Sequence, residues 1–306
     1  MDIALNFTLG LTEGISWPWP IAVYLFLAGI SGGAVATAIM MNLYRKQTAT
    51  NTPLLKAATL IGFVTIVLGM VCLVLDLTNP LYFWRILVFY NPTSVMSLGV
   101  MALLCYIPLV FILMLVAMRD QVKLGVIDGI IGWFDSHRCG LQWIVLVLAL
   151  TICAYTGFLI SALIRFPLIN QAVLPALFVA SGLSAGAAAS KMVAAGMFGE
   201  DQHSADLKLL HGAEWPIMAA EALCIFMIAV ALIGGNAAAQ VAAQAFTTGA
   251  WATEFWIGVV GIGFIVPILL SGVKNSAGFY LSGLASVTGM MCLRLFILYA
   301  GQLYSI

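Results

Sequence analysis

The sequence has little charge, few histidines and no paired cysteine motif. Only 8% of its 306 residues are Asp, Glu, Lys or Arg, whereas a soluble domain carries roughly 25%. Its 12 basic and 12 acidic side chains give a net charge of zero, so nothing in the charge favours a nucleic-acid partner. With 63% hydrophobic residues, a soluble chain of this length has too little interior to hide its apolar surface. The composition therefore predicts an all-α integral membrane protein.

The scarcity of metal-binding side chains excludes several electron carriers. Two b-type haems would need four axial histidines within the helices, and the chain has only His137, His203 and His211. The six cysteines form no CxxC pair, and most lie inside apolar runs, where cysteine acts as a small hydrophobe. We therefore expect no haem, no iron–sulfur cluster and no other metal in this protein.

Long apolar runs are what the sequence does contain. Each has about the 20 residues needed to cross a bilayer, and in lipid such runs should be helices. The segment before the first run carries Asp2 and Glu13 but no basic residue, so we expect a span there and not a signal peptide. The eight predicted spans are 19–43, 54–77, 94–118, 140–164, 170–197, 209–233, 251–272 and 278–303.

Lysine and arginine are distributed unequally between the two sides of these spans. Two, Arg85 and Arg165, fall on the side of the termini. Because positive charge favours the cytoplasmic side, we expect both termini to face outward, into the periplasm, from a bacterial inner membrane. The opposite side holds nine: Arg45, Lys46, Lys56, Arg119, Lys123, Arg138, Lys191, Lys208 and Lys274.

Three patterns recur in the same order in both halves of the sequence. "GISGGAVAT" begins at Gly29 and "GLSAGAAAS" begins at Gly182. The later pairs are the Gly-to-Pro spacings 99–108 and 258–267, and "YTGFL" at 155–159 with "YAGQL" at 299–303. Small residues such as Gly157 and Gly301 let helices approach closely. The repeats predict two four-helix bundles in parallel orientation, covering about 1–139 and 140–306.

Polar side chains gather at the outer ends of several spans and predict a binding pocket. Ionisable residues in spans are functional candidates, and a pocket with aromatic walls and a few hydrogen-bonding groups suits a quinone head group. We expect Asp76 to accept a proton from quinol and Tyr155 to hold a ring oxygen. Alternatively, Asp76 pairs with Arg85, and Tyr155 is an interfacial aromatic. Further predicted contacts are Trp19, Arg85, Ser94, Thr156 and Glu254.

A second polar set lies deeper in the second half. Glu214 and Glu221 are seven residues apart, so they share one helix face. These two, with Lys191 and Arg294, predict a proton path toward the inside. The alternative is structural pairing, of Glu214 with Lys191 and of Glu221 with Arg294, which would neutralise buried charge.

Six segments carry a recognisable pattern: "WPIAVYLFLAGISGGA" (19–34), "DLTNPLYFW" (76–84), "TSVMSLG" (93–99), "AYTGFLISALIRFPLINQAVLPALFVASGLSAGAA" (154–188), "FWIGVVGIGFIVPILL" (255–270) and "LRLFILYAGQL" (293–303). In these segments the sequence resembles the NrfD-like family, the integral membrane subunits of polysulphide reductase and formate-dependent nitrite reductase.

The resemblance implies eight helices and a haem-free site near the periplasmic face for menaquinol or ubiquinol. It also implies a periplasmic partner with several iron–sulfur clusters. In the nitrite branch, which the sequence resembles more, electrons continue through cytochromes c to reduce nitrite to ammonia. In the polysulphide branch a molybdopterin subunit is the terminal enzyme. Family site positions carry over to Tyr155 and Asp76, but this sequence has Trp17 and Trp19 where polysulphide reductase has a histidine.

The expected function is therefore that of an oxidoreductase component, a quinol dehydrogenase subunit. An alternative is the membrane subunit of a polysulphide, thiosulfate or related molybdopterin reductase. Parallel repeats and buried glutamates are also compatible with a secondary transporter. A passive anchor for a catalytic complex would need no pocket chemistry.

Overall fold

The computed structural model describes residues 17–77, 80–88, 91, 93–121, 128–273 and 275–304. Within those residues all regular secondary structure is helical. Lys123 and Lys274, two of the nine basic residues counted on one side, lie outside the described ranges.

Seven helices in the described part of the protein are long and apolar enough to cross a membrane. They are α2 (Trp19–Tyr44), α3 (Pro53–Leu75), α5 (Val95–Ala117), α7 (Arg138–Ser161), α8 (Leu174–Met197), α9 (Ala205–Ile233) and α12 (Ser276–Leu295), which continues through η5 (Phe296–Ala300) and α13 (Gly301–Leu303). At the start of several of these helices a side chain accepts a hydrogen bond from a backbone amide of the first turn. Thr52 accepts a hydrogen bond from the Leu55 amide at α3, and Asn275 accepts one from the Gly278 amide at α12.

The predicted span at 251–272 is shorter and less regular than expected. A π-helix, η4 (Glu254–Ile265), is followed by α11 (Val266–Leu270), which together give 17 residues. At about 1.5 Å per residue an α-helix of that length reaches about 26 Å, somewhat less than the hydrocarbon core of about 30 Å. Gly263 in η4 lies against the backbone of Gly289 in α12. Because neither residue has a side chain, the irregular segment packs closely on its neighbour.

Other predicted boundaries shift by a few residues. The run predicted at 170–197 begins as a helix only at Leu174, and the one predicted at 209–233 already begins at Ala205. Two short helices were not predicted from the sequence: α6 (Asp128–Ser136) and α10 (Ala237–Ala243), which is followed by η3 (Gln244–Phe246). Between α3 and α5 lie η1 (Pro80–Tyr82) and α4 (Trp84–Val88).

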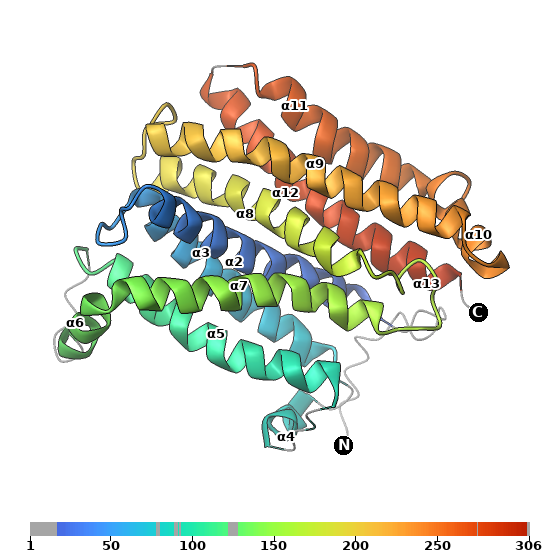
Figure 1. Ribbon diagram of the computed structural model, residues 1–306, viewed down its shortest axis with the longest axis horizontal. Helices are drawn as coiled ribbons and strands as arrows, with labels where there is room; N and C mark the ends of the chain where they lie inside the picture. The colour runs from blue at the N-terminus through green and yellow to red at the C-terminus, as the bar shows by residue number, and fades with distance from the viewer. Residues whose placement is uncertain are drawn as a thin grey trace, which may run out of the picture.

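Helices α2 and α8 lie in the middle of the structure. Helix α2 packs against α3, α7 and α8, and α8 packs against α9 and α12 (Figure 1). Helix α5 packs on α3 and α7, whereas η4 and α11 pack on α12. Nearly every residue of α2 from Ala28 to Ile39 is buried. A helix that is apolar all round is typical of such a central position.

The contact between α2 and α8 is made by the glycines of the predicted repeat. A Cβ atom at Gly33 would overlap the Gly182 carbonyl, and one at Gly186 would overlap the backbone at Gly33 and Ala34. The two backbones therefore touch without intervening side chains. Lipid provides no hydrophobic drive for helices to associate, so this close van der Waals contact is a main source of attraction between them.

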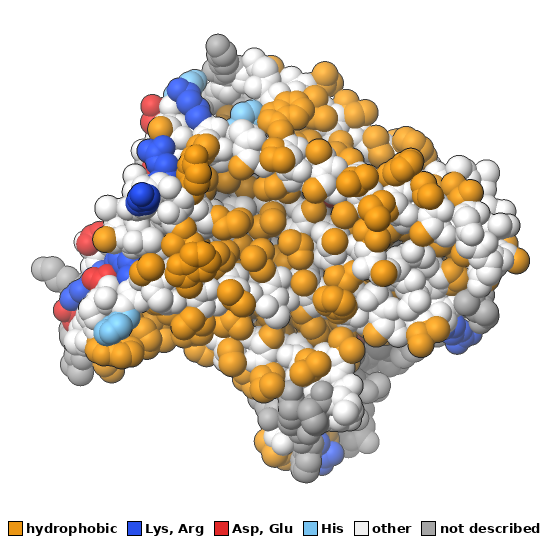
Figure 2. All heavy atoms as spheres, in the orientation of Figure 1, with side chains coloured by type: hydrophobic (Ala, Val, Ile, Leu, Met, Phe, Trp, Pro, Cys, Tyr) orange, Lys and Arg blue, Asp and Glu red, His pale blue; other side chains and the backbone are white. Residues whose placement is uncertain are grey.

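One end of the helices, which we call the basic end, carries most of the described lysines and arginines. Arg45 follows α2, Arg119 follows α5 and Arg138 begins α7. Figure 2 shows lysine, arginine and acidic side chains gathered along one edge, at the left, beside a broad hydrophobic surface. That surface is the one expected to face lipid.

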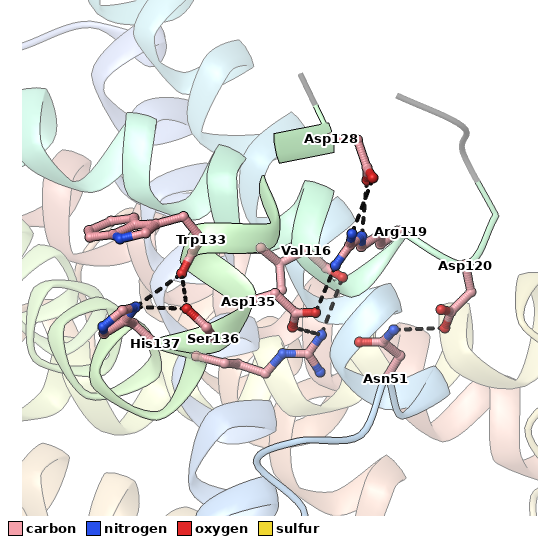
Figure 3. A network of polar contacts seen from close by, with 10 residues as sticks. Asn51, Val116, Arg119, Asp120, Asp128, Trp133, Asp135, Ser136 and His137 are labelled. Carbon is pink, nitrogen blue, oxygen red and sulfur yellow. Dashed lines mark hydrogen bonds and ion pairs between the residues drawn. The ribbon is translucent and has the colours of Figure 1, made fainter. Parts of the chain in front are cut away.

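Ion pairs at the basic end fix α6 to its neighbours (Figure 3). Arg119 bonds to Asp128 at 3.0 Å and to Asp135 at 3.1 Å, and Arg138 reaches Asp135 at 2.7 Å. Asn51 donates to Asp120 at 2.7 Å. These contacts connect the ends of α5, α6 and α7. Their role in the structure is to hold these ends together.

A methyl group placed in the α2–α8 contact should destabilise the protein. We expect Gly33→Ala to force the backbones apart and to cost about 1–3 kcal/mol of stability, the usual range for overpacking. Thermal unfolding of the detergent-purified protein would measure the change. Gly140→Ala is the matched control, because a Cβ there would have no neighbour within 4 Å. Equal unfolding midpoints for both variants would contradict this account of the contact.

Candidate functional site

An apolar pocket lies at the end of the helices opposite the basic end. It is formed by the start of α2, the end of α3, the start of α5 and the end of α7, and it encloses about 840 Å³ of empty space that opens outward. We call it the aromatic pocket. Its walls are Trp17, Ile21, Tyr24, Met70, Leu73, Val74, Asp76, Leu77, Phe83, Met96, Val100, Leu103, Tyr155 and Leu159.

Asp76 is the acidic side chain of this pocket. It directly follows the last residue of α3 and caps that helix, so the end of the helix places its carboxylate at the pocket wall. Burial raises the pKa of Asp76 above its ordinary value, because the charged form loses contact with water. The alternative pairing with Arg85 is not present: that guanidinium lies over the Tyr82 ring, 4.4 Å from its centroid.

Tyr155 occupies the opposite wall, and glycine makes room for it. A Cβ at Gly99 of α5 would overlap the Tyr155 ring. The Tyr155 hydroxyl donates to the Met96 carbonyl at 3.4 Å, a long hydrogen bond. The hydroxyl therefore remains available at the pocket surface for a second partner. Gly99 is the reason that a side chain as large as tyrosine fits between α7 and α5.

The glycines of the two Tyr-x-Gly motifs have the packing role expected from the sequence. A Cβ at Gly157 would overlap Pro175, at the start of α8, and one at Gly301 would overlap Ile169. The shared glycine therefore packs closely in both motifs, against the start of α8 at Gly157 and against the α7–α8 connection at Gly301. Tyr299, the repeat partner of Tyr155, instead stacks on Trp251 with ring centroids 5.1 Å apart.

Tyr24 is a pocket residue that the sequence analysis missed. It projects from α2 into the same pocket, is only 1% exposed, and its hydroxyl has no hydrogen-bond partner among the described residues. A buried hydroxyl without a partner is unfavourable, and an oxygen of a bound ligand would satisfy it. The spacing in the sequence puts Tyr24 on the same helix face as Ser31, seven residues later, but the burial of both is seen only in the structure.

The second half of the sequence helps to shape the pocket through Gln302. Its side-chain oxygen accepts from the Trp17 amide at 2.8 Å, and its side-chain nitrogen donates to the Trp17 carbonyl at 3.1 Å. Both bonds hold the backbone of Trp17 where its ring lines the pocket. Gln302 is thus a positioning residue, 285 residues away from the residue it holds.

Five other predicted contact residues are not among the pocket walls. Trp19 is 46% exposed, and Ser94 caps α5 without a side-chain bond. The Thr156 hydroxyl is buried and donates to the Cys153 carbonyl within its own helix. Arg85 stacks on Tyr82, and Glu254 lies beside Cys292 in the other half of the structure. The structure brings Asp76 and Tyr155 together, but not these five residues.

The deeper charged residues separate into two arrangements. Lys191 bonds to Glu214 at 2.6 Å, and His211 lies 3.0 Å from the same carboxylate. The predicted structural pairing of Glu214 with Lys191 is therefore confirmed. No ion pair within 4 Å joins Glu221 to Arg294 in the described structure, so that second pairing is not found. Arg294 is fully buried, donates to Ser181 at 2.8 Å, and lies over the Phe178 ring.

Two small cavities lie beside these groups. One of about 370 Å³ is lined by Lys191, His211 and Glu214, and another of about 240 Å³ is lined by Glu221 and Ser181, the partner of Arg294. Ser184 and Ser286 line both. Hydroxyl groups thus lie between the paired charges near the basic end and the unpaired charges at mid-helix.

The described residues contain no group of three or more His, Cys, Asp or Glu side chains that could hold a metal ion. The polar atoms facing the aromatic pocket are hydroxyl and carboxylate oxygens. Such a set can hydrogen-bond an organic ligand and accept a proton from it.

Comparison with known proteins gives these sites a family context. Residues 8–305 match the family model described as "Polysulphide reductase, NrfD". The protein belongs to this family. It is 40% identical over 302 residues to a polysulfide reductase chain of Wolinella succinogenes, and the match covers 95% of each sequence. It is 36% identical to protein NrfD of Escherichia coli, covering 95% of this sequence and 96% of that protein.

A more distant relative widens the range of family members. A selenate reductase subunit of Mesobacillus selenatarsenatis is 24% identical over 315 residues, covering 93% of this sequence and 73% of that protein. Members of the NrfD family are thus membrane subunits of different reductases. This protein is accordingly a multi-pass membrane component of the same redox class.

Breaking the Lys191–Glu214 pair should be more harmful than removing it. Lys191→Met leaves a buried carboxylate with only His211 beside it, and we expect a loss of about 3–5 kcal/mol. The double variant Lys191→Met/Glu214→Gln should recover much of this loss. Thermal unfolding of both variants measures the difference, with exposed Lys46→Met as control. A double variant less stable than Lys191→Met would show that the pair itself is required.

Proposed function

We propose that the protein is the quinol-oxidising membrane subunit of a respiratory complex. The observation that carries this proposal is the meeting of Asp76, Tyr155 and Tyr24 in one otherwise apolar pocket. Small-molecule sites are typically apolar pockets with a few directed polar groups. A quinol has a flat apolar ring with a hydroxyl at each end, which matches this distribution.

The reaction removes two protons and two electrons from the quinol and leaves a quinone. Tyr155 and Tyr24, on different helices, are placed to hydrogen-bond the ring oxygens. Asp76 accepts one of the two protons as the quinol hydroxyl is oxidised, which requires the carboxylate form, and the other leaves to water at the pocket opening. Menaquinol and ubiquinol share this head-group chemistry, and we take menaquinol as the expected substrate.

We further propose eight spans arranged as two four-helix bundles in parallel repeat. The segment Glu254–Leu270 supplies the eighth span, and the contact of Gly33 with Gly182 supports the repeat. Apart from Arg294, which lies in the middle of a span, the described lysines and arginines lie near one end of the helices or the other. Two, Arg85 and Arg165, lie at the end opposite the basic end. The seven at the basic end are Arg45, Lys46, Lys56, Arg119, Arg138, Lys191 and Lys208. This bias supports an inner-membrane orientation with periplasmic termini.

In that orientation the aromatic pocket lies at the periplasmic side. The two electrons then pass to a periplasmic partner that carries several iron–sulfur clusters. Our first proposal for the terminal electron acceptor is nitrite, as expected from the sequence, with electrons passing through cytochromes c. Polysulphide, reached through a molybdopterin subunit, is the second, favoured by the 40% identity to the polysulfide reductase relative. Identification of the subunits that co-purify with the protein would decide between them.

The polar groups of the second half form a proposed proton path. Lys191 and Glu214 lie nearer the basic end, and Glu221 and Arg294 lie deeper, with Ser184 and Ser286 between the two sets. Protons can pass along hydroxyl and carboxylate groups joined by water. The Lys191–Glu214 pair stabilises the part of this path nearer the basic end, whereas Glu221 forms no ion pair within 4 Å in the described structure.

Substitutions in the aromatic pocket should impair quinol oxidation. We expect Asp76→Asn to lower the rate at least about 100-fold, the usual contribution of a general base. Tyr155→Phe should weaken quinol binding about threefold to tenfold, as expected for a lost neutral hydrogen bond. Quinol-dependent reduction by the assembled complex measures both effects.

The controls keep the same chemistry outside the pocket. Glu254→Gln removes a carboxylate beside Cys292, and Tyr299→Phe removes the hydroxyl of the repeat partner. Both should retain near wild-type rates. If Asp76→Asn and Tyr155→Phe in fully assembled complexes matched these controls, the site assignment would be wrong.

The pH dependence should report on Asp76. Because its pKa is raised by burial, the active carboxylate forms only above the ordinary carboxyl range of about pH 4. The rate should therefore rise with pH through this raised pKa. This rise of the rate with pH should persist in Asp76→Glu. It should be absent from the remaining activity of Asp76→Asn. If the rate of Asp76→Asn rose with pH in the same way, the pH dependence would belong to another group.

A further inference from the structure

A second large cavity lies at the basic end, at the opposite end of the helices from the aromatic pocket. It encloses about 1020 Å³ of empty space that opens outward. Its walls come from the last turns of α8 and α11 and the first turns of α9 and α12. We call it the basic cavity. The quinol site does not use it, although Lys191 and His211 line both this cavity and the small cavity on the proposed proton path.

The basic cavity has basic groups but no acidic side chain in its lining. Its four basic residues are Lys191, His203, Lys208 and His211. The charge of Lys191 is balanced by Glu214 at 2.6 Å, and His203 lies 3.7 Å from Asp201. Lys208 forms no ion pair with any described residue. The cavity therefore holds a positive charge that the protein itself does not neutralise.

One side of the cavity is apolar and continues into the surface expected to face lipid. Leu207, Leu270 and Phe279 line it. Next to them, Leu269 is 70% exposed and Leu281 is 53% exposed. A ligand held here would thus have a charged part among the basic groups and an apolar part along α11 and α12. A soluble anion would make no use of the second feature.

We propose that the basic cavity binds the head group of an anionic phospholipid. Lys208 supplies the charge for the phosphate, and Ser271, Asn275 and Ser282 in the same lining supply hydrogen-bonding groups. The acyl chains lie along the exposed leucines. Basic pockets between membrane helices on the cytoplasmic side suit such head groups. A neutral quinone head group would leave the charge of Lys208 without a partner.

The test is a lipid titration of the delipidated full-length protein in neutral detergent, followed by native mass spectrometry and thermal unfolding. Phosphatidylglycerol should bind and raise the unfolding midpoint, whereas phosphatidylcholine should do so weakly. One basic group near the lipid contributes a roughly fivefold change in affinity. We therefore expect Lys208→Gln to weaken phosphatidylglycerol binding about fivefold, and Lys208→Arg to retain it.

Control variants and control ligands distinguish binding in this cavity from general attraction of anionic lipid to a basic surface. Lys46→Gln removes an exposed charge from the same end, outside the cavity, and should leave the affinity unchanged. Equal weakening by Lys46→Gln and Lys208→Gln would overturn the proposal, as would equal binding of phosphatidylcholine. If inorganic phosphate stabilised the protein as much as the lipid does, the proposal that the ligand is a lipid would be overturned. None of these measurements depends on quinol oxidation.

Discussion

The direct contact of the α2 and α8 backbones is the constraint on which the rest of the structure depends. Because Gly33 and Gly186 have no side chains, the two central helices approach until main-chain atoms touch. Within lipid, only such close packing and hydrogen bonds hold helices together. Helix α2 then presents Tyr24 to the aromatic pocket, and α8 presents Ser181 and Lys191 to the deeper polar groups. One contact thus fixes two chemically different regions relative to each other.

The aromatic pocket depends on further small residues and on the opposite half of the sequence. Gly99 makes room for the Tyr155 ring, and Gly157 brings α7 against the start of α8. Gln302 holds the Trp17 backbone with two hydrogen bonds. These residues need not touch a ligand. They set the positions of the groups that do, so the geometry of the pocket reflects the packing of the whole protein.

The sequence was sufficient to predict most helices, because about 20 apolar residues have few alternatives to a spanning helix. It also identified Asp76 and Tyr155, since polar groups are costly in such surroundings. Thr156, Ser94 and Glu254 were predicted from their depth along a helix alone. Depth does not determine the direction in which a side chain points, and these three point elsewhere. Tyr24 was missed because interfacial tyrosines are common, and only its buried neighbours distinguish it. The irregular Glu254–Leu270 segment reflects backbone contacts such as Gly263 with Gly289, which apolar composition does not reveal.

The two sets of buried charge differ in a way that bears on function. Glu214 and Lys191 are in direct contact, so each offsets the desolvation of the other. Arg294 is instead held by the Phe178 ring, the Phe178 carbonyl and the Ser181 hydroxyl, with no carboxylate within 4 Å in the described structure. If charge neutralisation were the only role of Glu221, direct contact with Arg294 would be the more favourable arrangement. The Lys191–Glu214 pair is thus a direct structural contact, whereas Glu221 lines a small cavity and Arg294 is held by groups without a full charge.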